Sequence, residues 1–436
     1  MKLSRYIHIE DNGNEKILYH TIEHSVITLP NECLNNNEII SESLDEESIE
    51  ALRDMGYFSE FDDDILSNIH HYFLNPKKLF ISVELNLTCN LRCPYCYQGE
   101  KKQGLISDEA IENLIRYYNL VYDKSPFEDL YLKVLGGEPT LVWKKFELLY
   151  NGTLMFCKNN DIKFHLLIDT NGTLIDNILQ LDHYDSLLLT VPLTFKDCHD
   201  SVRFDAKGNG TYDIIIDNLN TIKTQKKDTK IVIRYNVDDK NIKYFEDFVC
   251  DVSKRLCFKG LISLNYTAEL NGEDEFKNKL SYRDFVDWCS FEAIDILVKY
   301  DMPITVSPII SIEECQYRDM YSLKLFSDGT IGSCAMNFFD KKREFISNIV
   351  TNFDISEFVT NKNNQSLITK EDCKKCRYLF VCGGTNDLPC LKALDSNLCR
   401  DKIFNVNLKK FLSQYLKYQE EKNDLFVVFE DGESYR

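Results

Sequence analysis

The stretch that decides the fold is Leu85-Asn-Leu-Thr-Cys89-Asn-Leu-Arg-Cys93-Pro-Tyr95-Cys96-Tyr97. Its three cysteines have the spacing Cys-x3-Cys-x2-Cys and follow an apolar run over residues 79–87, which predicts a β-strand. Three thiolates on one short loop can hold three irons of a 4Fe–4S cube and leave the fourth iron open to a substrate or cofactor. A zinc site or buried structural cysteines are the alternatives, although no histidine lies within ten residues on either side to complete a zinc site.

A second motif, Gly136-Gly137-Glu138, follows another apolar run at residues 129–135. Glycine lets the backbone approach a ligand closely, and a carboxylate can accept a hydrogen bond from an ammonium group. On its own such a turn is an ordinary connection between a strand and a helix. Its meaning depends on the cysteine triad, which precedes it by about 40 residues.

Together these residues resemble the cofactor-binding loops of the radical S-adenosylmethionine (SAM) superfamily, whose cysteine loop has an aromatic residue where Tyr95 stands here. In that family the open iron binds the amino and carboxylate groups of SAM, and electron transfer then generates a 5'-deoxyadenosyl radical. The cofactors carry the chemistry, while the protein binds, orients and shields them. The resemblance implies iron ligation by Cys89, Cys93 and Cys96, and SAM contacts from Tyr95, Gly136, Gly137, Glu138, Arg203 and Asn236.

The segment after the predicted fourth strand matches the family only in part. Residues 199–203 keep the pattern His-Asp-x-x-Arg, and the resemblance assigns Arg203 to the SAM carboxylate because a guanidinium group can grip it through two hydrogen bonds. The serine found earlier in relatives is replaced by Thr-Val-Pro-Leu-Thr-Phe at 190–195, so Thr190 or Thr194 would substitute for it. We interpret His199 as a structural hydrogen-bonding residue.

Strands and helices alternate from residue 79 to residue 305, which predicts an α/β fold with a parallel sheet covered by helices. The predicted strands are 79–87, 129–135, 163–169, 186–193, 230–237 and 261–267. Helices are expected near 107–123, 142–158, 174–181, 211–226, 241–255 and 281–300. A doubly wound sheet or a barrel fits this pattern, and the resemblance favours a partial (β/α)6 TIM-type barrel. Sites on such sheets gather at the C-terminal ends of the strands, where the cysteine loop falls.

Residues 1–76 predict a small α+β domain that precedes the barrel at 77–310. Short strands are expected at 6–9, 16–20 and 25–29. Ser43 followed by Glu46 forms a capping-box pattern, which predicts that a helix starts there, and a second helix is expected at 61–73. This order is similar to that of the small domains that bind leader peptides in peptide-modifying enzymes. A plain N-terminal cap on the barrel is the alternative.

Cysteines resume near residue 315, in a pattern that resembles the SPASM extension of peptide-modifying radical SAM enzymes. We expect this domain at 311–405, with a hairpin turn at Asp328-Gly329, followed by a C-terminal helix and tail at 406–436. Where the extension has a cysteine four residues after Cys382, this chain has Asn386, and Cys390 would take its place. The resemblance assigns Cys315, Cys334 and Cys390 to one auxiliary 4Fe–4S cluster, and Cys373, Cys376, Cys382 and Cys399 to a second. A zinc ribbon on the Cys-x2-Cys pair is the alternative.

The composition limits the class of protein. The chain has 436 residues and 16 cysteines, and its N-terminus turns polar and acidic within ten residues. We therefore expect no signal peptide, a reducing cytoplasmic location, and metal ligation rather than disulfides. A net charge of −19 argues against a nucleic-acid partner, and the lack of any run of 18 uncharged apolar residues argues against a membrane span.

These observations favour a radical SAM oxidoreductase that modifies a ribosomally made precursor peptide, for example by a thioether cross-link. The expected cofactors are SAM and 4Fe–4S clusters, one that binds SAM and two that are auxiliary, and the expected electron donor is a flavodoxin or ferredoxin. A sulfatase-maturing enzyme that makes formylglycine is the enzymatic alternative. A cluster-bearing sensor without turnover is the alternative of another class.

Overall fold

The computed structural model describes most of the chain. The described residues are 1–23, 25–62, 77–96, 98, 104–267, 278–305, 316, 319–333, 347–351, 354–366, 371–382, 408–418 and 426–427. Several sequence-based expectations lie outside them: the helix expected beyond residue 62, and the cysteines Cys315, Cys334, Cys390 and Cys399.

A nine-stranded sheet forms the centre of the molecule. Its strand order is β11-β10-β9-β8-β7-β6-β13-β14-β15. The six strands from β6 to β11 pair in parallel, and they agree with the predicted strands to within a few residues: β6 (Lys78–Glu84), β7 (Asp129–Leu135), β8 (Lys163–Asp169), β9 (Ser186–Pro192), β10 (Lys230–Val237) and β11 (Leu261–Tyr266). The remaining three are short: β13 (Leu323–Leu325), β14 (Thr330–Gly332) and β15 (Ser347–Asn348).

The strand order distinguishes between the two architectures that the sequence left open. Each of β6 to β11 lies beside its neighbour in sequence, whereas a doubly wound sheet reverses its order at a switch point. Sequential order with helical crossovers is the arrangement from which a barrel wall is built. β13 pairs in parallel with the outer edge of β6, and the expected turn at Gly329, where φ is +85°, joins β13 to β14.

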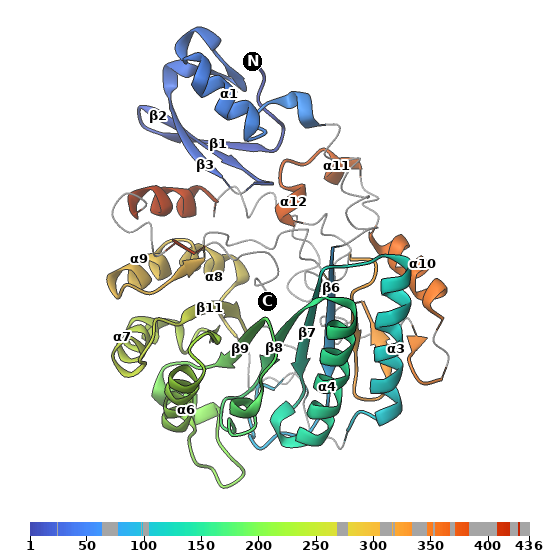
Figure 1. Ribbon diagram of the computed structural model, residues 1–436. Coiled ribbons are helices and arrows are strands. Elements are labelled where there is room, and N and C mark those ends of the chain that lie inside the picture. The colour runs from blue at the N-terminus through green and yellow to red at the C-terminus, as the bar shows by residue number, and fades with distance from the viewer. Residues whose placement is uncertain are drawn as a thin grey trace.

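Helices cover the outer face of the parallel sheet, as Figure 1 shows. They are α3 (Asp108–Lys124), α4 (Trp143–Asn160), α5 (Lys196–Val202), α6 (Tyr212–Gln225), α7 (Phe245–Arg255), α8 (Tyr282–Cys289) and α9 (Glu292–Lys299). In α3 the Ser107 hydroxyl accepts a hydrogen bond from the Ala110 amide, and an apolar stripe that includes Leu114 and Val121 packs into the main core.

Two helix predictions need correction. The segment 174–181 forms only a short 3-10 turn, Ile178–Gln180, rather than a crossover helix. The single helix expected at 281–300 is divided into α8 and α9, because Phe291 leaves the helical conformation between them, with φ −135° and ψ −76°.

The two faces of the parallel sheet differ in chemistry because side chains alternate along each strand. Residues such as Leu132 and Ile168 face the helices and join the main core. On the opposite, inner face, four side chains form a separate small cluster: Tyr131, Leu167, Leu188 and Val232. Two residues further along the same strands lies a polar layer toward the C-terminal ends: Lys133, Asp169, Thr190 and Arg234.

The N-terminal residues fold into a small α+β unit with its own apolar core. Its sheet has the order β1-β2-β3, and each strand lies close to a predicted one: β1 (Ile7–Asn12), β2 (Glu15–His20) and β3 (Val26–Pro30). A short hairpin follows, formed by β4 (Leu34–Asn35) and β5 (Glu38–Ile39). The helix α1 (Glu46–Asp54) starts two residues later than expected, because the Asp45 carboxylate, and not Ser43, caps it by accepting from the Ser48 amide at 2.7 Å.

The face of the N-terminal sheet that carries His8 packs near two short helices, α11 (Glu371–Lys374) and α12 (Leu379–Cys382), as Figure 1 shows. The buried Tyr378 hydroxyl and His8 Nδ1 are 2.6 Å apart, and the Thr21 hydroxyl donates to the Arg377 carbonyl oxygen at 2.7 Å. The rings of Tyr6 and Phe380 meet edge to face, with their centroids 4.9 Å apart. These contacts join the two ends of the chain.

The remaining elements are short. The helix α10 (Ile355–Ser366) lies near α3, and residues 408–418 are helical within the helix expected at 406–422. β16 (Phe426–Val427) pairs in parallel with β12 (Ile304–Thr305). Within the described ranges, no helix has both the length and the apolar composition that a membrane span requires.

We predict that Tyr378→Phe loosens the N-terminal sheet, because the variant leaves the buried His8 Nδ1 without its hydrogen bond. A buried hydrogen bond contributes about 1 kcal/mol, so amide hydrogen exchange in β1 and β2 should become roughly five times faster. Tyr244→Phe is the control, since the Tyr244 hydroxyl forms no hydrogen bond with the described residues. Equal exchange rates in β1 for the two variants would contradict this account of the docking.

Candidate active site

The cysteine loop begins directly after β6, at the C-terminal end of the strand, and its cysteines have no disulfide partner. Cys89, Cys93 and Cys96 are all half-buried. The Cys96 amide donates to the Cys93 carbonyl oxygen at 3.2 Å, which makes a tight turn between the last two thiols. The Cys89 sulfur accepts hydrogen bonds from the Leu91 amide at 3.4 Å and from the Asn171 side chain at 3.6 Å.

This donor set fits an iron–sulfur cluster. Three thiols lie on one loop, and N–H groups point at one of the sulfurs, which is how proteins support thiolate ligands. Among the described side chains, no three His, Cys, Asp or Glu residues are grouped so that they could hold a metal ion. Ligation therefore requires the three thiols to turn toward one another.

The two glycines of the second motif pack against the cysteine loop. A Cβ atom on Gly137 would lie 2.1 Å from the Thr88 carbonyl oxygen, and one on Gly136 would lie 2.3 Å from Asn86 Oδ1. The Gly137 amide donates to the Asn86 carbonyl oxygen, and the Glu138 amide donates to that of Thr88, both at 2.8 Å. The glycines are therefore required here by close contact between two loops, whereas the sequence suggested close contact with a ligand.

The Glu138 carboxylate is fully buried and accepts four hydrogen bonds. Thr140 donates to Oε1 through its amide at 3.2 Å and its hydroxyl at 2.7 Å, the Thr170 hydroxyl donates to Oε1 at 2.8 Å, and the Asn171 amide donates to Oε2 at 2.7 Å. Burial raises the pKa of Glu138, although the hydrogen bonds from Asn171, Thr140 and Thr170 oppose this shift. The side chain holds the end of β7 to the end of β8, and the predicted contact with a cofactor ammonium group stays a prediction.

Asn171 links this clamp to the cysteine loop. Its side-chain nitrogen donates to Asn90 Oδ1 at 2.8 Å, and Asn90 in turn donates to the Thr173 hydroxyl at 2.8 Å. The turn at 170–173 therefore braces the cysteine loop. The sequence analysis did not single out Asn86, Asn90 or Asn171. An asparagine side chain can donate through its NH₂ group and accept through its oxygen, so it can link two loops.

Arg203 and Tyr95 lie together beside the thiols. The guanidinium Nη1 donates to the Tyr95 hydroxyl at 3.0 Å, and the Arg203 side chain is 7% exposed. Burial opposes its charge, but the neighbouring Tyr95 and Cys93 raise the pKa of Arg203, so it remains a cation. Its buried Nε has no hydrogen-bond partner among the described residues, which leaves one donor for a bound anion.

His199 has the structural role that the sequence suggested. Its side chain is buried, and Nε2 lies 3.2 Å from the Thr211 hydroxyl, which donates to the Arg203 carbonyl oxygen at 2.8 Å. Burial and the neighbouring Arg203 charge lower the pKa of His199 well below its usual value, so the ring is neutral. It fixes the backbone at Arg203.

The polar layer on the inner face of the sheet forms a charged cluster that sequence reasoning missed in part. Lys133 Nζ lies 3.1 Å from Asp169 Oδ2, and the Arg234 guanidinium lies 3.7 Å from the same oxygen. Burial alone would raise the pKa of Asp169, but the charges of Lys133 and Arg234 outweigh it and lower the pKa. Asp169 Oδ1 is buried and has no hydrogen-bond partner among the described residues. Asn236, two residues beyond Arg234 on β10, is half-buried.

A family comparison agrees with these features. Residues 83–249, from β6 into α7, match the model of the Radical SAM superfamily. The chain contains a radical SAM domain and is an enzyme. The match spans the cysteine loop, the glycine motif and Arg203. The sensor without turnover is therefore set aside.

Curated relatives and solved structures resemble more of the chain than the radical SAM domain. A cysteine-type anaerobic sulfatase-maturating enzyme of Clostridium perfringens is 26% identical over 328 residues, which cover 68% of this chain and 85% of the relative. One from Clostridium novyi is 23% identical over 75% of this chain and 92% of its own. The structure of anSMEcpe with bound AdoMet has a TM-score of 0.57 and 19% identity, and covers 79% of this chain and 99% of its own. SuiB of Streptococcus suis bound to S-adenosylmethionine has a TM-score of 0.51 and 15% identity, and covers 92% of this chain and 99% of its own.

The predicted auxiliary ligands are only partly described. Cys373 lies on α11, and Cys376 follows in the turn, where its amide donates to the Cys373 carbonyl oxygen at 3.0 Å. Both are half-buried. Cys382 ends α12, and its side chain lies outside the described part of the chain, as do Cys315, Cys334, Cys390 and Cys399.

We predict that Glu138→Gln destabilises the radical SAM domain, because an amide nitrogen replaces an acceptor among four donors. The expected loss of unfolding free energy is about 2 kcal/mol, measured by urea denaturation under anaerobic conditions. The exposed Glu147 on α4 provides the control, and Glu147→Gln should change the free energy by less than about 0.5 kcal/mol. Equal stabilities of the two variants would show that the clamp is not required.

Proposed function

We propose that the protein is a radical SAM maturase that modifies a ribosomally made precursor peptide, for example by a thioether cross-link. The observation that carries this proposal is the N-terminal α+β unit docked on the Cys373–Cys382 segment. Structures of SuiB, one of which is bound to the precursor peptide SuiA, cover 92% of this chain, whereas structures of anSMEcpe cover 79–80%. The larger share of this chain that SuiB covers supports a precursor peptide as the substrate.

In this proposal Cys89, Cys93 and Cys96 would hold the first 4Fe–4S cluster, and the polar layer on the inner face of the parallel sheet would contribute to binding SAM. When bound, the cluster and SAM supply the hydrogen-atom abstraction that such a modification needs. Two buried polar atoms without partners among the described residues, Arg203 Nε and Asp169 Oδ1, support a polar ligand at this place. An unpaired buried polar atom is costly, so a bound ligand would relieve that cost.

The residues around this ligand have separate roles. The Arg203 guanidinium donates to the Tyr95 hydroxyl, and the Thr211 hydroxyl donates to the Arg203 carbonyl oxygen. These two contacts hold the cation where it would bind the SAM carboxylate. Asp169 and Lys133 place one acceptor and one donor on the inner face, where Arg234 keeps the carboxylate ionised. Asn236 and the backbone of the Gly136-Gly137-Glu138 turn complete the proposed contacts.

The auxiliary clusters complete the proposal. One would be held by Cys315, Cys334 and Cys390, and the second by Cys373, Cys376, Cys382 and Cys399. A flavodoxin or ferredoxin would donate electrons. The turn from Cys373 to Cys376 supports the second assignment, since a Cys-x2-Cys turn presents two thiols on one side.

A second candidate is a sulfatase-maturating enzyme that converts cysteine or serine to formylglycine. The identities of 26% and 23% to curated enzymes of that kind favour it. Both candidates use a peptide segment as substrate, so they share the radical SAM site and differ in the bond that is made.

We predict that anaerobic reconstitution gives about eight to twelve irons per chain, because two or three cubes carry four irons each. Replacing Cys89, Cys93 and Cys96 together by alanine should remove about four irons and abolish 5'-deoxyadenosine formation from SAM. Cys198→Ala is the control, since Cys198 lies on α5 and belongs to none of the three predicted ligand sets, so this variant should change neither value. Bound zinc without iron would refute the radical chemistry.

We predict that the wild-type enzyme, given SAM and a reductant, removes two hydrogens from a cysteine-containing precursor peptide encoded beside its gene, and that the peptide keeps its sulfur. High-resolution mass spectrometry distinguishes this product from formylglycine, in which oxygen replaces the cysteine sulfur. A cysteine-containing sulfatase peptide should remain unchanged in a parallel reaction. Formylglycine in the sulfatase peptide, with no change in the precursor, would establish the second candidate instead.

A further inference from the structure

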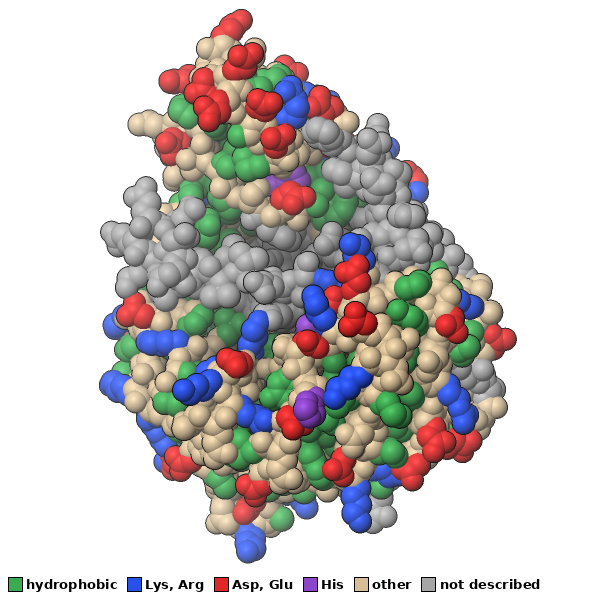
Figure 2. Space-filling model, viewed as in Figure 1, with side chains coloured by type: hydrophobic (Ala, Val, Ile, Leu, Met, Phe, Trp, Pro, Cys, Tyr) green, Lys and Arg blue, Asp and Glu red, His purple; other side chains and the backbone are tan. Residues whose placement is uncertain are grey.

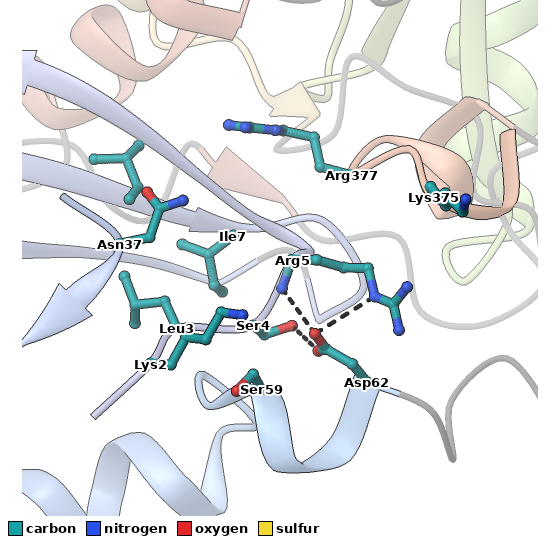
Figure 3. Close-up of a pocket in the computed structure, with 11 residues that line it drawn as sticks. Lys2, Leu3, Ser4, Arg5, Ile7, Asn37, Ser59, Asp62, Lys375 and Arg377 are labelled. Atoms are coloured by element: carbon teal, nitrogen blue, oxygen red, sulfur yellow. Dashed lines mark hydrogen bonds and ion pairs between the residues drawn. The ribbon is translucent and has the colours of Figure 1, made fainter. Parts of the chain in front are cut away.

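A cleft lies where the N-terminal unit meets the Cys373–Cys382 segment, which we call the auxiliary segment. The proposed SAM site does not use this cleft. Its volume is about 480 Å³, which is within the range of ligand sites. Figure 3 shows that strand β1 and the residues before it form one side, while the turn between α11 and α12 forms the other. The lining residues are Lys2, Leu3, Ser4, Arg5, Ile7, Ile9, Asn37, Ser59, Asp62, Lys375 and Arg377.

The cleft is basic, although the surrounding unit is acidic. Residues 1–62 carry 14 acidic and four basic side chains, and two of those four, Lys2 and Arg5, line this cleft. Figure 2 shows the acidic side chains gathered over the outer surface of the N-terminal unit. Lys375 and Arg377 face the same cleft from the auxiliary segment. Two parts of the chain that are far apart in sequence therefore place cations at one site.

Among the described residues that line the cleft, Asp62 is the one carboxylate, and it is already engaged. Asp62 accepts from the Ser4 hydroxyl at 2.6 Å and from the Arg5 amide at 3.1 Å, and it lies 3.4 Å from the Arg5 guanidinium, as Figure 3 shows. Within the described residues, Lys2, Lys375 and Arg377 form no ion pair with a carboxylate. Three exposed cations are thus left to attract an anionic ligand.

The floor of the cleft indicates which anionic ligand fits. Leu3, Ile7 and Ile9 provide an apolar surface, and Asn37 and Ser59 add side chains that form hydrogen bonds. This mixture suits a peptide whose acidic residues flank an apolar side chain. A nucleic acid would need an extended basic footprint, which the acidic unit around the cleft does not offer.

We infer that this cleft binds an acidic and apolar segment of the precursor peptide, an inference that rests on the proposed function. The docking contacts explain why the position matters. The Thr21 hydroxyl holds the Arg377 carbonyl oxygen, and Lys375 and Arg377 lie on either side of Cys376. A peptide in the cleft is therefore held directly beside a predicted cluster ligand.

The test uses the reconstituted full-length enzyme and a fluorescein-labelled heptapeptide in which acidic residues alternate with leucine. Fluorescence anisotropy should show that this peptide binds about ten times more tightly than its matched Asn and Gln peptide. Lys375→Glu combined with Arg377→Glu should weaken binding about tenfold, and Lys2→Glu, which is remote from the cysteines in sequence, should weaken it about threefold. Lys158→Glu combined with Lys227→Glu, two exposed lysines of the radical SAM domain, is the matched control and should bind like the wild type.

Two results would overturn the inference: equal binding of the acidic and neutral peptides, or equal binding by the wild type and by cleft variants whose iron content is normal. Displacement of the acidic peptide by a single-stranded oligonucleotide at equal concentration would also overturn it in favour of nucleic acid. The proposed function is judged separately by modification of the precursor. If the wild type modifies the precursor and the cleft variants do so with an unchanged KM, the cleft inference fails while the function stands. If the wild type modifies no precursor, the function fails whatever the anisotropy shows.

Discussion

Two loops that are distant in sequence meet at the buried carboxylate of Glu138, and the geometry of the candidate site depends on the hydrogen bonds that this group accepts. The bonds from Thr170 and Asn171 hold the end of β8 to the end of β7. Asn171 then reaches Asn90 and the Cys89 sulfur in the loop after β6. Because the glycines before Glu138 leave no space for a Cβ atom, the glycine turn and the cysteine loop can approach to backbone contact. The thiols are therefore positioned by a rigid neighbour.

The same arrangement separates a protected interior from the outer surface. On the inner face of the parallel sheet, an apolar cluster is followed by the charged layer around Asp169. The charged layer lies nearer the C-terminal ends of the strands, where the cysteine loop begins. Beyond this end of the sheet, the N-terminal unit contacts the segment that contains Cys373 and Cys376 through His8 and Thr21. The segment that contains Cys373 and Cys376 is thus packed against the same N-terminal unit that forms one side of the proposed peptide cleft.

The amino-acid sequence predicted the strands closely, because buried parallel strands are continuous apolar runs such as 163–169 and are easy to recognise. It also placed Arg203 and Tyr95 in one site, because Tyr95 belongs to the cysteine motif and Arg203 to a second motif of the family that the chain resembles. It failed at 174–181, where an apolar pattern forms only a 3-10 turn, and at Ser43, where Asp45 provides the cap instead. Local patterns do not determine which of two nearby capping residues is used.

Pairings between distant residues could not be predicted from the sequence. The contact of Glu138 with Asn171, and that of Lys133 with Asp169, each join different strands, so each depends on register. The docking of His8 on Tyr378 spans almost the whole chain and has no local signal. The cleft formed by Lys2, Arg5, Lys375 and Arg377 follows from that docking, and for the same reason it is visible only in the folded structure.

The central claim is that Cys89, Cys93 and Cys96 hold a cluster whose open iron binds SAM. Electron paramagnetic resonance of the dithionite-reduced enzyme, recorded with and without SAM, tests this most directly. Our account predicts that SAM shifts the g-values of one reduced 4Fe–4S signal, and that this signal is missing when the three cysteines are replaced by alanine. A spectrum that SAM leaves unchanged, in protein with its full iron content, would contradict the account.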